Sequence, residues 1–119
     1  MERLPVKAFT SISSRKVVNG RPYSAFNILN GDTLNLFTAL SDGAFLLRGF
    51  DNKKLRTRIF YDADSPSSIN KTTRLLAKLR AHKIIKKVPR SNRYYLTNPG
   101  RSLISSVLLY TNKELLNVA

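Results

Sequence analysis

Hydroxyl, amide and cationic side chains recur at helical spacing between residues 67 and 82. At 100° per residue they gather on one face of a helix, whereas apolar residues fall on the opposite face. Arginine forms two parallel hydrogen bonds with guanine, asparagine does so with adenine, and serine and lysine suit phosphate oxygens. The chemistry of this face is therefore hydrogen bonding to a polyanion. Its members are Ser67, Asn70, Arg74, Lys78 and Ala81, with Lys71 at the margin.

A second group of cations surrounds the sequence Pro89-Arg90-Ser91-Asn92, whose composition predicts a turn between two strands. Arg90 and Arg93 lie in or beside this turn, and Lys86 and Lys87 precede it. Successive side chains of a strand point to opposite faces, so only one of the two lysines can face a common partner.

The overall charge favours a polyanionic partner. Twenty-one Lys and Arg residues against seven Asp and Glu give a formal net charge of +14 over 119 residues. Residues 1–64 contribute +4 and residues 65–119 contribute +10, and no acidic residue occurs from Ser65 to Lys113. A basic helix face is often only a solvated surface, but 49 residues with eleven cations and no anion favour binding. Nucleic acid is the first candidate partner and an anionic membrane surface the second.

The sequence does not favour catalysis. It has no cysteine, which excludes disulfides, thiol catalysis and zinc–thiolate sites. Asp62 and Asp64 suggest a metal-dependent nuclease, but such a site needs several converging carboxylates, and helix-end and capping positions explain both residues more simply. His82 falls at a helix end, where it favours the helix dipole. No glycine-rich phosphate loop or Ser-His-Asp set is present. We therefore expect no enzymatic activity, no cofactor and no metal.

Neither a membrane helix nor a signal peptide is predicted. The longest apolar runs, such as residues 44–47, are much shorter than the roughly 18 residues that a membrane helix needs. Residues 1–7 lack the apolar core of a signal peptide. We expect a cytoplasmic, nucleoid-associated protein.

The elements that would position these side chains begin with a hairpin. Two runs of strand-forming residues, 12–18 and 21–28, flank Asn19-Gly20, the dipeptide best suited to the positive φ angles of a type I′ turn. The spacing predicts that these runs pair as antiparallel strands.

Two helices are predicted next. The first has Asp32 as its N-cap and a buried stripe of Leu34, Leu36, Phe37 and Leu40, and ends at Asp42-Gly43. A short apolar connection over residues 44–47 leads to the second helix. That helix runs from an Asp51 cap to about Tyr61, with Leu55, Ile59 and Phe60 facing inward.

A third helix, a second hairpin and a closing helix complete the prediction. The third helix covers about residues 67–82 behind the cap signal Ser65-Pro66. Residues 84–88 and 93–97 form the hairpin, and Thr97 caps a helix from about Asn98 to Val118. The apolar stripe of the third helix consists of Ile69, Thr72, Leu75, Leu76 and Leu79.

The predicted fold class is α+β, mainly α. The three helices and the hairpin after them follow the plan of a winged helix-turn-helix. We expect an N-terminal β-hairpin extension over residues 1–29 and a winged-helix domain with a long C-terminal helix over residues 30–119.

Residues 75–100 resemble a pattern of bacterial winged-helix DNA-binding proteins, including the MarR-like regulators. The pattern is L-x-x-L-x-x-x-G-L-I-x-[KR] followed by Y-x-L-T-x-x-G. The chain matches it from Leu76 to Lys87 and from Tyr94 to Gly100. Residues 48–56 also look like the entry to the second helix of that family. One departure from the pattern is notable, because Lys83 stands where its glycine supplies a left-handed helix cap, so we expect a looser or differently shaped helix end.

The resemblance implies how the side chains would be used. The helix over about 67–82 would lie in the major groove, and the wing over 84–97 would lie on the backbone or minor groove. Asn70 and Arg74 would read bases, and Arg90 and Arg93 suit the narrow minor groove. Neutralisation of about six to eight phosphates would make affinity fall steeply with salt. The remaining contacts, expected mainly on phosphates, are Ser67, Ser68, Lys71, Lys78, Lys86 and Lys87.

Three kinds of partner stay open. The expected one is double-stranded DNA, bound by a small transcriptional regulator or a targeting module. The alternatives are an RNA- or ribosome-associated protein and a protein-interaction domain that meets an acidic partner. A homodimer through the C-terminal helix is also expected, unless the N-terminal hairpin covers the surplus apolar residues of that helix, which are Val107, Leu108, Leu109, Tyr110, Leu115 and Leu116.

Overall fold

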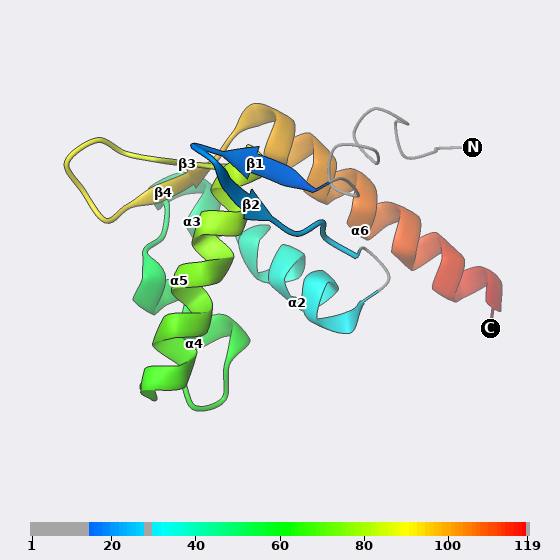
Figure 1. The fold of residues 1–119 in the computed structure, drawn as a ribbon. Helices are drawn as coiled ribbons and strands as arrows, with labels where there is room; N and C mark the ends of the chain where they lie inside the picture. Colours follow the sequence, from blue (N-terminus) through cyan, green and yellow to red (C-terminus); the bar gives the residue numbers. More distant parts are fainter. Residues whose placement is uncertain (1–14, 28–29, 119) are drawn as a thin grey trace.

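The protein has an α+β fold that is mainly helical (Figure 1). The computed structural model describes residues 15–27 and 30–118, with side chains through residue 111. Along this part of the chain a β-hairpin is followed by four helices, a second hairpin and a long helix. The predicted fold class is confirmed at this level. The elements are β1 (Lys16–Val18), β2 (Arg21–Tyr23), α2 (Gly31–Leu40), α3 (Gly43–Arg48), α4 (Asn52–Ile59), α5 (Pro66–Ala81), β3 (Ile85–Lys87), β4 (Tyr94–Leu96) and α6 (Asn98–Val118).

The first hairpin forms around the predicted turn. Asn19 and Gly20 have φ angles of 53° and 78°, as a type I′ turn requires. β1 and β2 pair antiparallel, with Val17 opposite Pro22. The paired segments are shorter than predicted, and residues 12–14 and 28 of the prediction lie outside the described part of the chain.

Two sequence predictions between residues 30 and 48 are wrong. The N-cap of α2 is Asn30 rather than Asp32, because the Asn30 side chain accepts a 2.8 Å hydrogen bond from the Asp32 backbone N–H. Residues 43–48 form the helix α3 instead of an apolar connection, and Asp42 caps it by accepting a 2.8 Å bond from Ala44. Asp42 therefore caps α3 directly after α2 has ended at its C-cap, Ser41.

The next two helices start at their predicted caps. The Asp51 carboxylate accepts a 2.8 Å bond from the Lys54 N–H at the start of α4. The Ser65 hydroxyl accepts a 3.1 Å bond from the Ser68 N–H at the start of α5. These caps satisfy backbone donors that have no partner inside the helix.

α5 ends in a left-handed cap, although the residue at the cap is a lysine rather than a glycine. Lys83 adopts a φ of 61°, its N–H bonds to the Arg80 carbonyl, and the Ile84 N–H bonds to the Leu79 carbonyl, both at 3.0 Å. These two bonds define a Schellman cap. The expectation of a looser or different end is therefore wrong, because the backbone accepts the left-handed conformation at a non-glycine residue.

The second hairpin is joined by a short third segment. β3 and β4 pair antiparallel with Ile85 opposite Leu96, and Phe50 exchanges two backbone bonds with Tyr94, at 2.9 and 2.7 Å. The approach depends on Gly49, which has a φ of 73° and whose added Cβ would lie 2.6 Å from the Tyr94 carbonyl oxygen. The chain between α3 and α4 is thereby fixed against β4.

Thr97 starts α6 and ties it to the end of α5. Its hydroxyl accepts a 2.9 Å bond from the Gly100 N–H and donates a 2.7 Å bond to the Lys83 carbonyl. A Cβ on Gly100 would overlap the carbonyl oxygen of Ile84. Threonine and glycine at this spacing therefore bring the first turn of α6 against the start of β3.

One hydrophobic core lies between the helices and beneath β3 and β4. Its fully buried side chains include Phe37, Phe50, Leu55 and Leu79. Phe26, from the predicted N-terminal extension, is 4% exposed and joins the same core. Ile69, predicted in the buried stripe of α5, is 37% exposed.

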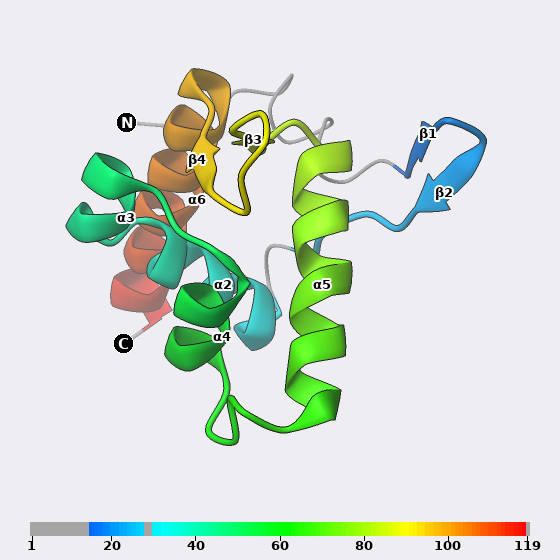
Figure 2. The same ribbon diagram turned by 90° about the vertical axis from the view of Figure 1, so that its left-hand side faces the viewer.

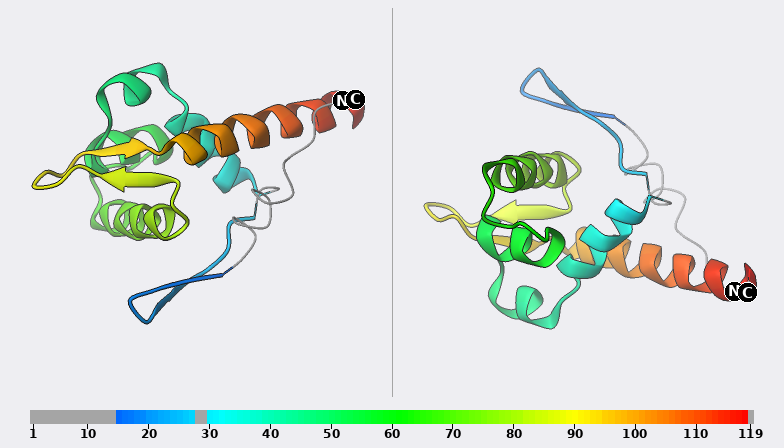
Figure 3. Two further views of the ribbon diagram at one scale, coloured as in Figure 1. Left: turned by 90° about the horizontal axis from the view of Figure 1, so that it is seen from above. Right: turned by 90° about the horizontal axis from the view of Figure 1, so that it is seen from below.

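The two hairpins flank α5. Figure 2 shows α5 with the β1–β2 hairpin on one side and β3 and β4 on the other. Seen from above and below, the turns of both hairpins extend toward the same side of the molecule (Figure 3). Among the described residues, no helix is both long and apolar enough to cross a bilayer.

Candidate nucleic-acid interface

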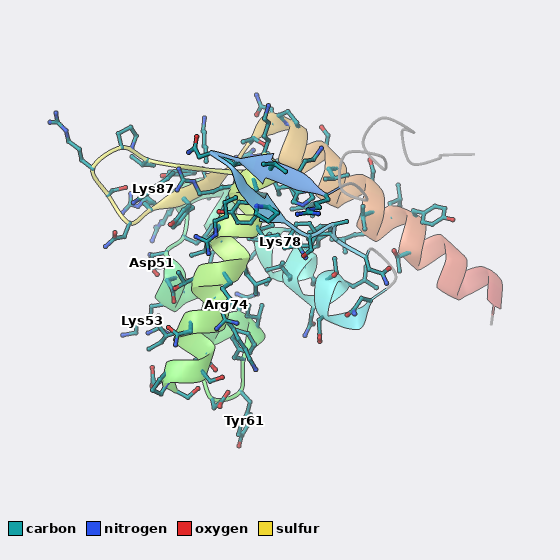
Figure 4. The ribbon with its side chains drawn as sticks, in the orientation of Figure 1. Asp51, Lys53, Tyr61, Arg74, Lys78 and Lys87 are labelled. Carbon is teal, nitrogen blue, oxygen red and sulfur yellow. The ribbon has the colours of Figure 1, made fainter. Side chains whose placement is uncertain are left out.

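The outward face of α5 carries most of the side chains that the sequence singled out. Ser67, Asn70, Lys71 and Arg74 are exposed. The two cations among them, Lys71 and Arg74, form no ion pair with another described residue. Figure 4 shows Arg74 in the middle of α5, with Lys78 nearer the β1–β2 hairpin. This face presents donors to the solvent along about two turns of helix.

Ser68 does not belong to that face. It is 3% exposed, and its hydroxyl donates a 3.0 Å hydrogen bond to the Asp62 carboxylate while accepting one from Ser65. The predicted phosphate contact is therefore wrong as a surface contact. Ser68 instead holds the turn between α4 and α5 to the start of α5.

The C-terminal part of the predicted face is covered rather than exposed. Ala81 is 8% exposed, and Lys78 is half-buried with its Nζ 4.1 Å from the centre of the Phe26 ring. Burial lowers the pKa of Lys78 below its ordinary value. Helical spacing placed these residues outward, but residues 24–27 pack over this end of α5.

Four exposed cations surround the turn of the second hairpin. Lys86, Lys87, Arg90 and Arg93 are all exposed. Lys87 lies opposite Tyr94 in the sheet register and Lys86 lies opposite Tyr95, so the two lysines occupy different faces. Arg90 has a φ of 60° at the tip of the turn.

An open groove connects α4, α5 and this turn. It has a volume of about 470 Å³, and Tyr94 lines it, which places Lys87 on the same face of the hairpin as the groove. Sequence reasoning missed four of its polar lining residues because their positions on neighbouring elements become adjacent only in the fold. They are Lys53, Thr73, Arg80 and Asn92.

Hydrogen bonds fix the floor of the groove. Asn52 donates a 3.2 Å bond to the Thr73 hydroxyl and accepts a 2.7 Å bond from Arg56. The Arg56 guanidinium also donates a 2.8 Å bond to the Ala63 carbonyl. Arg56 thus serves the α4–α5 connection, whereas Lys53 and Arg80 have no such partner among the described side chains.

The carboxylates near this surface are engaged in the fold. Asp51 caps α4, and Asp42 caps α3 and forms a 2.7 Å ion pair with Arg58. The pKa of Asp42 is lowered mainly by the hydrogen bond from the Ala44 N–H and next by the hydrogen bond from the Arg58 side chain. The pKa of Asp62 is lowered mainly by the hydrogen bond from the Ser68 hydroxyl. Within the described residues, Arg58–Asp42 is the one ion pair formed. Most of the described cations therefore have no acidic partner in the fold and are available to an external anion.

The described residues hold no group of three histidine, cysteine or acidic side chains that could bind a metal ion. Asp62 bonds to Ser68, and Asp64 lies exposed in the turn before α5.

Comparisons with protein-family models, curated proteins and solved structures found no match to this chain.

Proposed function

We propose that this chain binds double-stranded DNA as a winged helix-turn-helix protein. In this assignment α2, α4 and α5 are the three helices, β3 and β4 with the Phe50 bridge are the sheet, and the turn over residues 88–93 is the wing. α5 enters the major groove, and the wing lies on the backbone or minor groove. The resemblance of residues 75–100 to winged-helix regulators supports the same assignment.

The observation that carries the proposal is the groove shared by α4, α5 and the wing. Lys53 on α4 and Arg80 on α5 are exposed cations that line it, and Lys87 lies on the same face of the wing. The Asp51 carboxylate beside them accepts the N-cap hydrogen bond of α4. A convex helix bordered by cations on both neighbouring elements matches a duplex, whose two phosphate strands border each groove.

The proposed contacts are of two kinds, to base edges inside the major groove and to phosphates along its borders. Asn70 and Arg74 are exposed on α5, on the side away from its buried residues Thr72, Leu76 and Leu79, and read base edges. Ser67, Lys71 and Lys53 contact phosphates near the start of α5 and α4, and Arg90 and Arg93 contact the strand next to the wing. A role as a transcriptional regulator or a targeting module follows if one DNA sequence is preferred over others.

Fluorescence anisotropy tests this proposal. A labelled random-sequence duplex and a structured RNA are titrated with the protein at several salt concentrations. We expect duplex binding with a steep salt dependence. Arg74→Ala should weaken it severalfold, because the substitution removes one cation from the face that contacts the duplex. Arg90→Ala/Arg93→Ala should weaken it and reduce the salt slope by about 2.

Arg48→Ala is the matched control for Arg74→Ala. Arg48 is also exposed but lies on α3, outside the outward face of α5, so its loss should have a small effect. Equal effects of both variants would indicate nonspecific attraction and contradict the proposed role of α5. Binding to the RNA alone would favour an RNA-associated function. Failure to bind either one at low salt would point to an acidic protein partner.

A further inference from the structure

The β1–β2 hairpin projects from the body with little packing of its own. Val17 is 65% exposed and Val18 is 41% exposed, and as neighbours in β1 they occupy opposite faces of the hairpin. A two-stranded hairpin is marginally stable in water unless something else holds it. Its turn nevertheless has the residues and φ angles of an ideal type I′ connection. The hairpin therefore has a well-defined turn, but its two valines do not contribute to the core.

Its base is fixed firmly to α5. The Ser24 carbonyl lies 2.9 Å from Nε2 of His82, and the Phe26 ring lies 4.9 Å from the His82 ring. Phe26 also packs 5.8 Å from Phe37, and Lys78 covers its other side. These contacts join the hairpin to the C-terminal half of α5 and set its direction relative to that helix.

The hairpin is basic and faces the same side as the wing. Arg15, Lys16 and Arg21 occur within residues 15–27, where there is no acidic residue. Arg15 and Arg21 are exposed, and the Arg21 guanidinium lies 5.8 Å from the Tyr23 ring centre, which holds it near the strand. Both hairpin turns extend toward one side of the molecule, with α5 between them (Figures 2 and 3).

We infer that the β1–β2 hairpin is a second basic arm that binds the phosphate backbone of the same duplex, on the side of α5 opposite the wing. This inference rests on the proposed DNA binding. With α5 in the major groove, the wing contacts one flanking strand, and Arg15, Lys16 and Arg21 contact the other. The arm adds affinity without sequence preference, because phosphate contacts carry no base information.

A pair of charge-matched variants tests the arm. Arg15→Gln/Arg21→Gln removes two cations from the hairpin and leaves Phe26 and the His82 contact unchanged. Arg48→Gln/Arg101→Gln removes two exposed cations from α3 and α6, across α5 from the hairpin. Duplex affinity is measured against salt concentration for both. The hairpin variant should reduce the magnitude of the salt slope by about 2, at about 0.9 per lost phosphate contact. The control should leave it nearly unchanged.

Hydroxyl-radical footprinting on a bound duplex gives a second readout. The hairpin variant should lose protection at one end of the footprint, whereas Arg90→Ala/Arg93→Ala should lose it at the other end. Equal slopes for the two Gln variants, or protection lost evenly along the footprint, would overturn the arm while the proposed DNA binding stands. If the unmodified protein does not bind the duplex at all, the proposed function fails and the arm fails with it.

Discussion

At the scale of single residues, neighbouring serines have opposite environments. Ser67 is exposed in the first turn of α5, whereas Ser68 is buried and bonded to Asp62. Both had looked like phosphate contacts in the sequence, because the period of a helix does not show that the preceding turn folds back. The cap signal at Ser65-Pro66 was visible, but the reach of Asp62 across six residues was not.

Alanine substitution distinguishes the roles of the two serines. Ser67→Ala should weaken duplex binding severalfold, whereas Ser68→Ala should leave binding nearly unchanged. Ser68→Ala should instead raise the pKa of Asp62 toward its ordinary value of 3.8, because it removes the largest cause of the lowering. Carbon-detected NMR titration of Asp62 and anisotropy on the same proteins measure both effects.

The sign of the resulting pH dependence follows from that shift. A carboxyl group with a lower pKa in the folded state stabilises the protein above the unfolded pKa, and this contribution is lost as pH falls through the folded value. Ser68→Ala should therefore make stability less sensitive to acid below pH 4. An Asp62 pKa that does not change in Ser68→Ala would contradict the assigned hydrogen bond.

Lys83 predicts a stabilising substitution. A left-handed φ costs a non-glycine residue about 1 kcal/mol, and Lys83 has a φ of 61° in the cap of α5. Lys83→Gly should therefore raise the free energy of unfolding by up to about 1 kcal/mol. Urea denaturation checks this, with Lys83→Ala as a control that removes the charge but keeps the backbone cost. An equal gain in both variants would assign the effect to charge instead.

At the scale of elements, the helix caps decided which predictions succeeded. Asp51, Ser65 and Thr97 each combine a favourable side chain with a clear start of helical periodicity, so α4, α5 and α6 begin where predicted. α3 was missed because six residues are too few to show a helical period, and its apolar sequence also suits an extended segment. Asn30 and Asp32 both suit a cap, and only the fold distinguishes them.

The joint between β3 and α6 makes a prediction about glycine. Gly100→Ala should destabilise the protein by about 2 kcal/mol or more, because the new Cβ meets the Ile84 carbonyl and the backbone must move. Gly43→Ala is the control, since nothing lies within 4 Å of a Cβ there, and it should change stability by no more than about 0.5 kcal/mol. Thermal denaturation measures both, and similar losses would contradict the close approach at Gly100.

At the scale of the whole molecule, the sequence could not show that the N-terminal segment covers α5. Phe26 and Lys78 are 52 residues apart, and no periodicity links them. Ser24 and Phe26, which follow the hairpin, contact the C-terminal half of α5, and the Phe26 ring joins the core 5.8 Å from Phe37 of α2. Val107 is buried and Leu109 is 45% exposed, while the side chains of Leu115 and Leu116 lie outside the described part, so the homodimer stays a prediction.

Phe26 is the point where the hairpin is attached. Phe26→Ala should lower the free energy of unfolding by about 3 kcal/mol and release the hairpin from α5. Hydrogen exchange should then show faster exchange in β1 and β2 than in α5, beyond the general loss of stability. Val17→Ala serves as the control, because Val17 is 65% exposed and its loss should leave exchange in α5 unchanged. Equal acceleration throughout the chain would contradict a separate attachment.

The use of carboxylates as caps limits how this protein can be engineered or can evolve. A simple route to tighter binding of a polyanion is to replace acidic residues, since each replacement adds one unit of positive charge. Here Asp42, Asp51 and Asp62 each hold the start of a helix or the turn before it. Neutralising any of these three would increase affinity but lower the stability of the fold. Asp64 is exposed in a turn and forms no such bond among the described residues. Variants selected for stronger binding should therefore accumulate new lysines and arginines on the surface before they lose these three aspartates.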